Sequence, residues 1–438
     1  MRHYTWIFTL LIASVIFHAE AAKAATPKVK TNPSTKLRAG KPLKIYIMTG
    51  QSNMEGHARE KTLAGLAMDP KTKALYEKLA DKDGKARVYK DISVAAFTAK
   101  KKEMVKTGPL TVGFGAGFEQ DKMGTEFAFG VTLYEHLKEP ILIIKASWGG
   151  KDLNRQFRPP SAGPFPISER DLAQADTEKG KKKISWLKES TGEYYRLLVK
   201  HVKTVLADPA KYCSAYDPEQ GVELAGFIWF QGWNDVIAKL YKNHDYSEYT
   251  RLLSLFIKDL RKEFQAPDMP FVVGIIGFGG EDTDGPGVLG LRKAQAAIAD
   301  IEEFKGNVIA VPTAPYWDKR MEDLTQIKLA AQAPETKKGR KKTYAERDPE
   351  GKWADRRARY QAWKKEIEAN KPGKDASKGE QRKWYVQWRW GGDDKIFTPE
   401  ELEYMEKNSS NAGLHYYGSA KTYSQMGEAF ANALINLE

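Results

Sequence analysis

The sequence predicts an α/β fold with a parallel central sheet, because short apolar runs alternate along the chain with segments of helical periodicity. We expect the runs at residues 43–48, 141–144, 224–230, 271–276 and 308–311 to form buried parallel strands. The 438 residues are 41% hydrophobic, which supplies a sizeable core and excludes a mainly disordered chain. Length alone allows two or three domains, or one enlarged α/β domain with a long insertion.

The first 24 residues predict a cleaved secretory signal peptide. Arg2 precedes an apolar run from Trp6 to Phe17, and small residues with Ala-x-Ala spacing follow it. The run is too short to span a bilayer core of about 30 Å, and no later segment approaches the ~20 apolar residues that a membrane helix needs. We therefore expect a secreted or periplasmic protein without a transmembrane segment, and a flexible lead-in over residues 25–41.

Two segments have clear helical spacing. Residues 246–264 place apolar side chains at i, i+3, i+4, i+7 and i+11, which predicts a helix with one face against a sheet. The last predicted helix follows a start signal at Gly418 and Ser419, and its apolar residues from Met426 to Leu437 repeat this spacing. In such an α/β protein, we expect the functional site at the carboxyl ends of the strands.

The charge of the chain is concentrated in one region. The net charge is +13, which suits anionic partners, and residues 321–390 hold 19 Lys or Arg against 11 Asp or Glu. The simplest interpretation of this basic insertion is a solvated loop at residues 337–342 and a charged helix at residues 353–367. The alternative is a surface that binds sugars or nucleic acid bases, because aromatic and basic side chains alternate between residues 382 and 390.

Several classes of site are disfavoured by the residues that the chain lacks. The single cysteine, Cys213, excludes an intrachain disulfide framework and a thiolate zinc cluster. No pair of histidines has the spacing of metal ligands, and no glycine-rich segment has the context of a phosphate-binding loop. We expect neither a metal nor a cofactor.

A serine lies at the carboxyl end of the first predicted strand. Residues 50–56 read GQSNMEG, and this puts Ser52 in a tight turn where its side chain can stand above the sheet. A serine hydroxyl becomes a useful nucleophile only when a base takes its proton. Among the histidines, His57 is close in sequence and His244 lies in a polar turn, whereas His415 lies immediately before the last predicted helix.

Four short motifs occur in order along the chain: GQSNM at residues 50–54, SWGG at residues 147–150, GFIWFQG at residues 226–232 and GLH at residues 413–415. Together they resemble the ordered blocks of the sialate O-acetylesterase-like (carbohydrate esterase) branch of the SGNH hydrolase superfamily. The resemblance implies a three-layer α/β/α hydrolase domain over residues 42–320 and 391–438. The basic insertion at residues 321–390 lies outside it.

The resemblance also implies roles for individual residues. Ser52 would attack an ester carbonyl, and His415 would accept the serine proton and later return it. The oxyanion hole would consist of the backbone N–H of Ser52, a backbone N–H from Gly149 or Gly150, and the side-chain amide of Gln231.

The chain departs from the family pattern at the acid that orients the histidine. This acid usually sits three residues before the histidine, where the chain has Ala412. We predict Asp235 in its place, with Glu126 and Asn411 as alternatives, although Asp235 fits a helix N-cap equally well. A serine–histidine dyad without an orienting acid is a further alternative.

These observations predict an exported serine esterase that removes O-acetyl groups from carbohydrates, such as sialic acid or acetylated polysaccharide, through an acyl-enzyme on Ser52. The positive net charge favours an acidic polysaccharide as partner. The alternative, motivated by Ala412, is a non-catalytic glycan-binding relative that uses the basic, aromatic insertion. Nucleic acid is not an expected partner, because an exported protein does not meet it.

Overall fold

The computed structural model describes residues 40–99, 104–238, 241–339 and 341–437. The predicted signal peptide, and the predicted lead-in up to residue 39, lie outside the described residues. Within the described ranges, no helix has both the length and the apolar character needed to cross a membrane.

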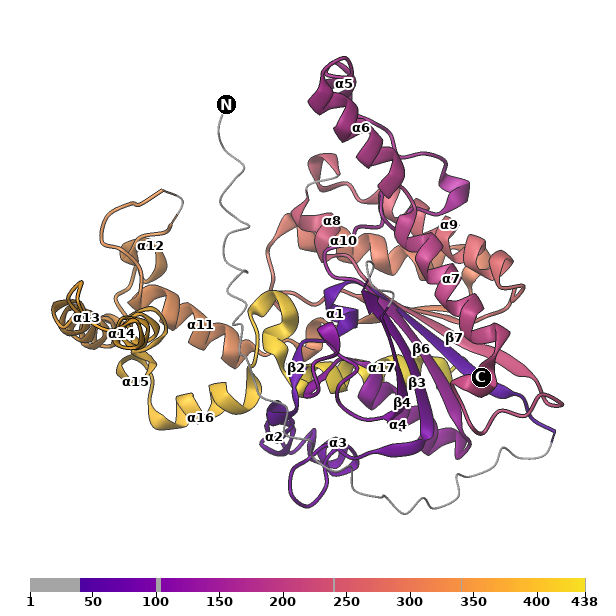
Figure 1. Ribbon diagram of the computed structural model, residues 1–438, viewed down its shortest axis with the longest axis horizontal. Helices are drawn as coiled ribbons and strands as arrows, with labels where there is room; N and C mark the ends of the chain where they lie inside the picture. The colour runs from indigo at the N-terminus through magenta and orange to yellow at the C-terminus, as the bar shows by residue number, and fades with distance from the viewer. Residues whose placement is uncertain (1–39, 100–103, 239–240, 340, 438) are drawn as a thin grey trace. The chain divides into compact units, whose positions relative to one another are not determined.

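A seven-stranded sheet forms the centre of the fold, with the strand order β4-β3-β6-β1-β7-β8-β9 (Figure 1). Its strands are β1 (Leu43–Gly50), β3 (Tyr89–Ala99), β4 (Met104–Leu110), β6 (Ile141–Ser147), β7 (Val222–Phe230), β8 (Phe271–Ile275) and β9 (Val308–Pro312). All neighbouring strands are parallel except β3 and β4, which pair antiparallel at one edge. The five predicted strands are confirmed as β1, β6, β7, β8 and β9.

The antiparallel pair β3 and β4 was not predicted from the sequence. Strand β3 has two charged residues, Lys90 and Asp91, near its start. Strand β4, which lies at the edge of the sheet, contains Pro109, a residue that edge strands tolerate. An edge strand with a solvated side needs no continuous apolar run, so it escapes a search for buried strands. A second sheet pairs β2 (Ala58–Arg59) with β5 (Lys122–Met123).

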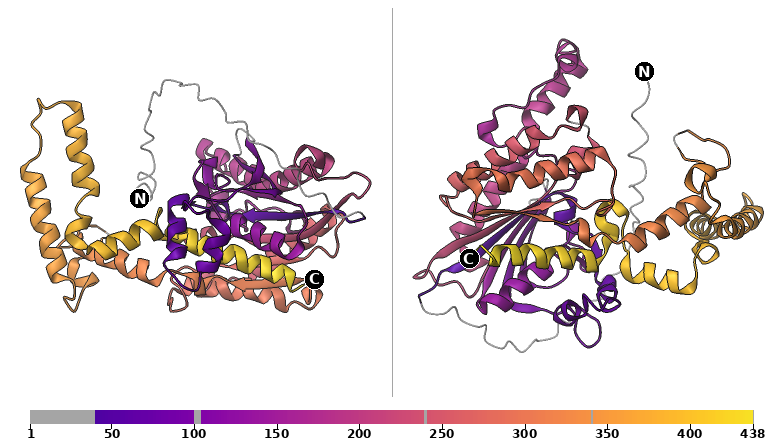
Figure 2. Two further views of the ribbon diagram at one scale, coloured as in Figure 1. Left: turned by 90° about the horizontal axis from the view of Figure 1, so that it is seen from below. Right: turned by 180° about the vertical axis from the view of Figure 1, so that it is seen from behind.

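Helices cover both faces of the sheet, which confirms the predicted three-layer α/β/α architecture (Figures 1 and 2). One face meets α7 (Glu193–Ala207) and α9 (Ser247–Glu263), and the other meets α4 (Glu126–Leu137) and α17 (Ala420–Ile435). Strand β7 shows the alternation. Its Phe227 packs against Phe256 of α9 at 6.1 Å between ring centroids, and its Phe230 packs against Phe430 of α17 at 5.5 Å.

The two predicted helices are confirmed as α9 and α17. Helix α17 begins where the sequence indicates, because the side chain of Ser419 accepts a hydrogen bond from the backbone N–H of Thr422. The remaining helices of this part of the fold are α1 (Ser52–Glu55), α2 (Ala64–Ala67), α3 (Lys73–Leu79), α5 (Glu169–Leu172), α6 (Glu178–Ser190), α8 (Trp233–Ile237) and α10 (Pro286–Ala296).

The strand register brings three of the four sequence motifs together at the carboxyl ends of the parallel strands. Gly50, the last residue of β1, pairs with Ser147 at the end of β6 and with Phe230 at the end of β7. The segments that follow these three residues therefore leave the sheet side by side. This is the edge at which a ligand site is expected in a parallel sheet.

A second hydrophobic cluster lies in the helices before the last motif, with Met321, Leu324, Tyr360, Trp363 and Ile396 among its buried members. Its helices are α11 (Lys319–Ala331), α12 (Tyr344–Arg347), α13 (Ala354–Ala369), α14 (Lys378–Trp390), α15 (Asp393–Ile396) and α16 (Pro399–Asn408). The predicted charged helix is confirmed as α13. Helices α13 and α14 lie side by side (Figure 2), and we call residues 354–390 the helical arm.

Candidate active site

Ser52 begins helix α1 directly beyond the end of β1, and it is 8% exposed. The chain turns at Gly50, whose φ is 158°. A Cβ atom there would lie 2.0 Å from the carbonyl oxygen of Phe230, so the close contact between β1 and β7 requires glycine. The tight turn predicted from the sequence therefore has a steric cause.

Asn53 connects the serine turn to the segment that carries the histidine. Its Nδ2 donates to the carbonyl oxygen of Leu414 at 3.3 Å, and its Oδ1 accepts from the hydroxyl of Tyr423 at 3.0 Å. Asn53 follows Ser52, and Leu414 precedes His415. The segments that carry Ser52 and His415, the two predicted catalytic residues, are therefore in contact through these neighbours.

His415 lies in a sharply turned segment, η9 (Gly413–Gly418), between α16 and α17. The next two residues, Tyr416 and Tyr417, have φ values of 48° and 57°, which is the left-handed region that side chains other than glycine seldom adopt. The hydroxyl of Tyr416 accepts from the backbone N–H of Gly277 at 2.8 Å, and its ring is fully buried. Tertiary contacts therefore hold the strained turn that presents His415.

Asn411 orients the imidazole of His415. The distance between His415 Nδ1 and Asn411 Oδ1 is 3.0 Å, and the same oxygen accepts from the backbone N–H of Ala412 at 2.8 Å. An amide oxygen only accepts hydrogen bonds, so the neutral His415 ring carries its proton on Nδ1. Its Nε2 then bears the lone pair, which is the arrangement a general base requires.

The structure corrects the prediction for the orienting residue. Asp235 is fully buried and accepts from the backbone N–H of Leu153 at 3.1 Å and from the hydroxyl of Tyr241 at 3.0 Å. Burial, and then the charge of Asp152, raise the pKa of Asp235 to about 7. A carboxyl group held by these partners on α8 does not reach His415, whereas Asn411, the predicted alternative, does.

Gln231 also differs from its predicted role. Its Nε2 lies 2.6 Å from Asp235 Oδ2 and 2.9 Å from the carbonyl oxygen of Lys151, and its Oε1 accepts from the hydroxyl of Tyr249 at 3.0 Å. Both hydrogens of the amide thus have acceptors within the fold, and the residue is 1% exposed. Gln231 braces the carboxyl end of β7 and has no hydrogen left for an oxyanion.

Gly149 lies beside the serine. A Cβ atom at Gly149 would lie 3.7 Å from the Cβ of Ser52 and 3.0 Å from Oε2 of Glu55. The loop is fixed to the serine turn by a hydrogen bond of 3.1 Å from the N–H of Trp148 to the carbonyl oxygen of Gly50. Both glycines are exposed, but a Cβ at Gly150 would meet nothing within 4 Å. The structure therefore places Gly149, rather than Gly150, next to Ser52.

His57, which was not predicted as a site residue, lies directly against His415. Its ring stacks on that of His415 with centroids 3.8 Å apart and planes 4° apart. Asn411 Nδ2 lies 3.4 Å from His57 Nδ1, so one amide contacts both imidazoles. Among the described residues, His57 Nε2 has no hydrogen-bond partner. The available signal was the position of His57 directly after the GQSNMEG motif.

Both imidazoles are held in the neutral form at neutral pH. Burial lowers the pKa of His415 to about 4, with a further contribution from the charge of Lys122. Burial also lowers the pKa of His57 to about 3, followed by the effects of His415, Lys122 and Lys145. His415 is therefore available as a base at any pH well above 4.

A buried ion pair supports the end of the serine helix. Lys145 Nζ lies 2.6 Å from Oε2 of Glu126 and donates to the carbonyl oxygens of Glu55 at 2.8 Å and Phe114 at 2.9 Å. Burial lowers the pKa of Lys145, and the charge of Glu126 opposes this effect. Glu126, another alternative for the orienting acid, is thus engaged with Lys145.

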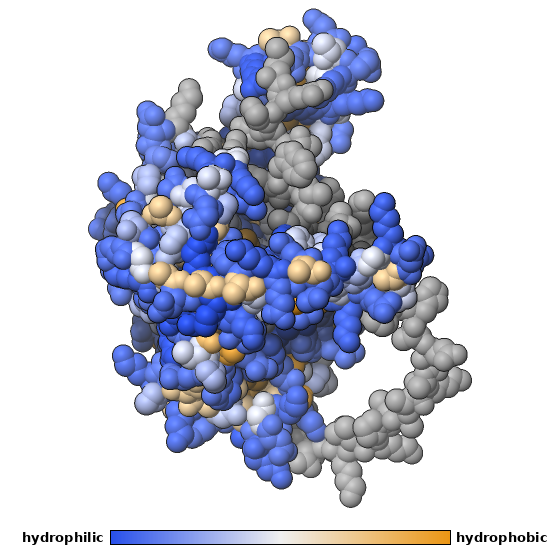
Figure 3. All heavy atoms as spheres, turned by 90° about the vertical axis from the view of Figure 1, so that its left-hand side faces the viewer, coloured by the Kyte–Doolittle hydropathy of each residue, from blue (hydrophilic) through white to orange (hydrophobic). Residues whose placement is uncertain are grey.

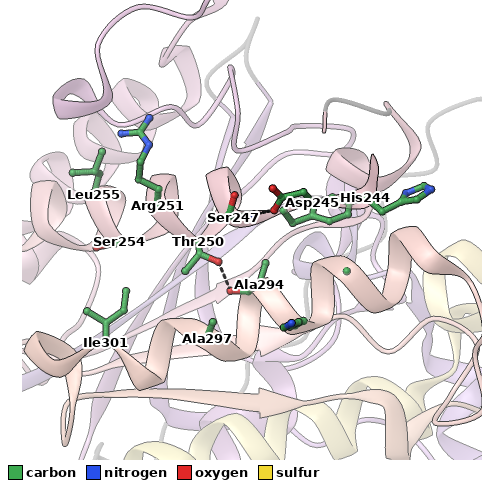
Figure 4. A pocket seen from close by; sticks show the side chains of 13 residues that line it. His244, Asp245, Ser247, Thr250, Arg251, Ser254, Leu255, Ala294, Ala297 and Ile301 are labelled. Atoms are coloured by element: carbon green, nitrogen blue, oxygen red, sulfur yellow. Dashed lines mark hydrogen bonds between the residues drawn. The ribbon is translucent and has the colours of Figure 1, made fainter. Parts of the chain in front are cut away.

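One cavity among the described residues lies away from the predicted site residues. It has a volume of about 750 Å³, lies along α9 and α10 and is lined by residues such as Thr250, Arg251 and Ala294 (Figure 4). None of the predicted site residues lines it. In the part of the chain that the structure describes, no group of three His, Cys, Asp or Glu residues is arranged to hold a metal ion.

Comparisons with solved structures find distant likenesses. A protein from Arabidopsis thaliana has 18% identity and a TM-score of 0.35, covering 62% of this chain and 86% of its own. A carbohydrate acetylesterase from Xanthomonas citri has 13% identity and a TM-score of 0.36, covering 61% and 49%. NanS has 15% identity and a TM-score of 0.35, covering 62% and 78%. Among curated proteins, no significant match is found.

The family comparison covers more than half of the chain. Residues 42–306 match the family model described as carbohydrate esterase, sialic acid-specific acetylesterase. This range contains the serine motif and the loops that follow β6 and β7. The chain belongs to the carbohydrate esterase, sialic acid-specific acetylesterase family.

Proposed function

We propose that the protein is an exported serine acetylesterase that removes O-acetyl groups from carbohydrates by way of an acyl-enzyme on Ser52. Family membership supports an acetylesterase with a carbohydrate substrate. The observation that carries the proposal is the hydrogen bond between His415 Nδ1 and Asn411 Oδ1, because it leaves Nε2 as the basic nitrogen on a segment that Asn53 ties to the serine turn.

In this proposal, His415 Nε2 takes the hydroxyl proton as Ser52 Oγ attacks the ester carbonyl. The tetrahedral intermediate collapses, the C–O bond to the sugar breaks, and His415 returns its proton to the leaving sugar oxygen. Water then attacks the acetyl-serine with His415 again as base, which releases acetate and restores the serine.

The developing negative charge on the carbonyl oxygen needs donors that are already in place. Ser52 is the first residue of α1, and the first N–H groups of a helix have no partner within it. Gly149 lies beside it and brings a second backbone N–H without a side chain in the way. We assign the oxyanion hole to these two N–H groups, and we leave Gln231 out.

Asn411 supplies orientation without negative charge. An aspartate would also stabilise the imidazolium that forms during attack, so an asparagine site should be slower than one with an acid. The neutral amide is nevertheless held in the useful orientation, because its Nδ2 faces His57 and its Oδ1 faces His415. His57 thus acts as a positioning residue.

The test is acetate release by the purified mature protein, compared with Ser52→Ala. The substrates are a small acetyl ester, O-acetylated sialic acid and acetylated xylan, and a serine-directed fluorophosphonate reports the nucleophile. We expect release and labelling of Ser52 in the wild type and neither in Ser52→Ala. If both folded proteins release no acetate, the non-catalytic glycan-binding alternative replaces this proposal.

Export is part of the proposal and has its own support. The segment before residue 25 has the charged start, the apolar run and the small-residue site of a signal peptide. Expression of the full-length gene in a bacterial host, followed by N-terminal sequencing of the exported protein, tests it. We expect the mature chain to begin close to residue 25.

A further inference from the structure

Helix α14 carries a row of exposed side chains, three of which are basic and one aromatic. Arg382, Tyr385 and Arg389 follow one another at i, i+3 and i+7, which places them on one face of the helix, and Lys378 extends the row by one turn. From Lys378 to Arg389 the row spans about 16 Å at the rise of an α-helix. A row of this length suits a polymer better than a single sugar.

The row leads into a cavity of about 440 Å³ at the loop between α13 and α14. Lys371 and Lys374 line it on the loop side, and Trp384 and Tyr385 line it on the helix side. The indole N–H of Trp384 donates to the carbonyl oxygen of Ile367 at 2.7 Å, so this ring is fixed against α13. The ring of Tyr385 is 51% exposed beside it.

The charge of the helical arm is not neutralised on this side. Residues 354–390 hold 11 Lys or Arg against 5 Asp or Glu, a net charge of +6. The inner arginines have carboxylate partners, since Arg356 pairs with Glu401 at 2.7 Å and Arg357 with Glu335 at 2.6 Å. Those two ion pairs bind the arm to α16 and to the loop between α11 and α12.

In the described part of the chain, the basic side chains on the outer side of the arm, in contrast to Arg356 and Arg357, have no carboxylate partner. Within the described residues, no ion pair to a carboxylate is formed by Lys371, Lys374, Arg382 or Arg389. Figure 3 views the side of the molecule on which the arm lies and shows it covered mainly by hydrophilic residues. The outer cations therefore form a solvated positive surface with an aromatic ring at its centre.

We propose that the surface formed by Lys371, Lys374, Arg382, Tyr385 and Arg389, which we call the arm surface, binds an acidic polysaccharide. The basic side chains attract its anionic groups, and the exposed face of Tyr385 packs against a sugar ring. A glycan is favoured over a nucleic acid because the chain belongs to a carbohydrate esterase family. The binding requires no ester chemistry and so does not depend on the proposed activity.

The experiment measures binding of the Ser52→Ala protein to polygalacturonate by isothermal titration calorimetry, with pullulan as the uncharged polymer. We expect binding to polygalacturonate alone, and an affinity that falls as salt increases. Lys371→Gln combined with Lys374→Gln should weaken binding about tenfold, and Tyr385→Ala should do the same. Tyr385→Phe, which keeps the ring, should bind like the parent protein.

The matched control removes two exposed positive charges from another helix. Lys179→Gln combined with Lys182→Gln on α6 changes the net charge equally and should leave the affinity unchanged. Equal losses in the arm and control variants would overturn the proposal, because the attraction would then follow net charge alone. Duplex DNA that binds tighter than polygalacturonate and is insensitive to Tyr385→Ala would also overturn it, in favour of a nucleic acid partner. Thermal unfolding confirms that each variant is folded.

Discussion

The imidazole rings of His57 and His415 stack 3.8 Å apart, and the side-chain amide of Asn411 contacts the Nδ1 of each. The two ends of an amide are not equivalent, since the oxygen accepts and the nitrogen donates. His57 Nδ1 must therefore be the acceptor and His415 Nδ1 the donor. This arrangement fixes the tautomer of both rings. The neutral amide of Asn411 contacts His415 where an acid three residues before the histidine, at the position of Ala412, is usual.

Removal of the amide should impair catalysis far more than folding. In Asn411→Leu, His415 loses the acceptor that keeps its proton on Nδ1, so the wrong tautomer becomes accessible. We expect kcat to fall by about 10³-fold, which is less than the roughly 10⁴-fold loss seen when a triad acid is disabled, because the amide of Asn411 supplies no negative charge. Steady-state kinetics on a small acetyl ester measure this, and KM should change little. An unchanged kcat would remove Asn411 from the mechanism.

A double-mutant cycle tests whether His57 acts through Asn411. His57→Phe retains a stacked ring but removes the acceptor for Asn411 Nδ2, so the amide can rotate and present Nδ2 to His415. We expect kcat to fall by about tenfold. In the Asn411→Asp background both ends of the side chain are oxygens, and the same His57→Phe change should cost much less.

The cycle would contradict this role of His57 if the effects of the two substitutions on kcat were independent. If His57→Phe reduces kcat by the same factor with asparagine and with aspartate at position 411, the two residues act independently. His57 would then be a packing residue, and NMR of the His415 ring would show the Nδ1-protonated form in both proteins.

The sequence was sufficient to predict the parts of the fold that depend on local pattern. Continuous apolar runs identified β1, β6, β7, β8 and β9, because strands buried on both faces leave no alternation to misread. The edge strand β4 and its neighbour β3 were missed because several of their residues are exposed to solvent, which interrupts the apolar pattern. Ser52 and His415 were predicted from the sequence motifs, and a hydrogen bond joins the segments that carry them.

The orienting residue could not be read from the motifs. Asp235 has the right charge and follows β7, but its hydrogen bonds to Leu153 and Tyr241 depend on loops distant in sequence. Likewise, the contact between His57 and Asn411 joins residues that are separated by most of the chain. Pairings of this kind are set by tertiary packing, which a single sequence does not display.

The activity should persist to an unusually low pH, because the fall of kcat/KM on the acid side reports the pKa of His415. His415 acts as a base only when neutral, and its pKa is lowered to about 4 by burial and by Lys122. We therefore expect log(kcat/KM) to stay level from pH 7 down to about 5 and to fall below about pH 4.5, with unit slope at lower pH. Circular dichroism at each pH separates this loss from acid unfolding. A limb centred near 6.5 would show that the imidazole titrates as if it were exposed.

Asp235 should affect stability, in contrast to Asn411. In Asp235→Ala the N–H of Leu153, the hydroxyl of Tyr241 and the amide of Gln231 lose a shared buried acceptor, and an unsatisfied buried donor costs about 1–3 kcal/mol. We expect a decrease of roughly 3 kcal/mol in the free energy of unfolding, measured with urea at pH 6, against less than about 1 kcal/mol for Asn411→Leu. The acid limb of kcat/KM should not move in Asp235→Ala, because the carboxyl group has no contact with His415. A shifted limb with unchanged stability would reverse the assignment and return Asp235 to the catalytic site.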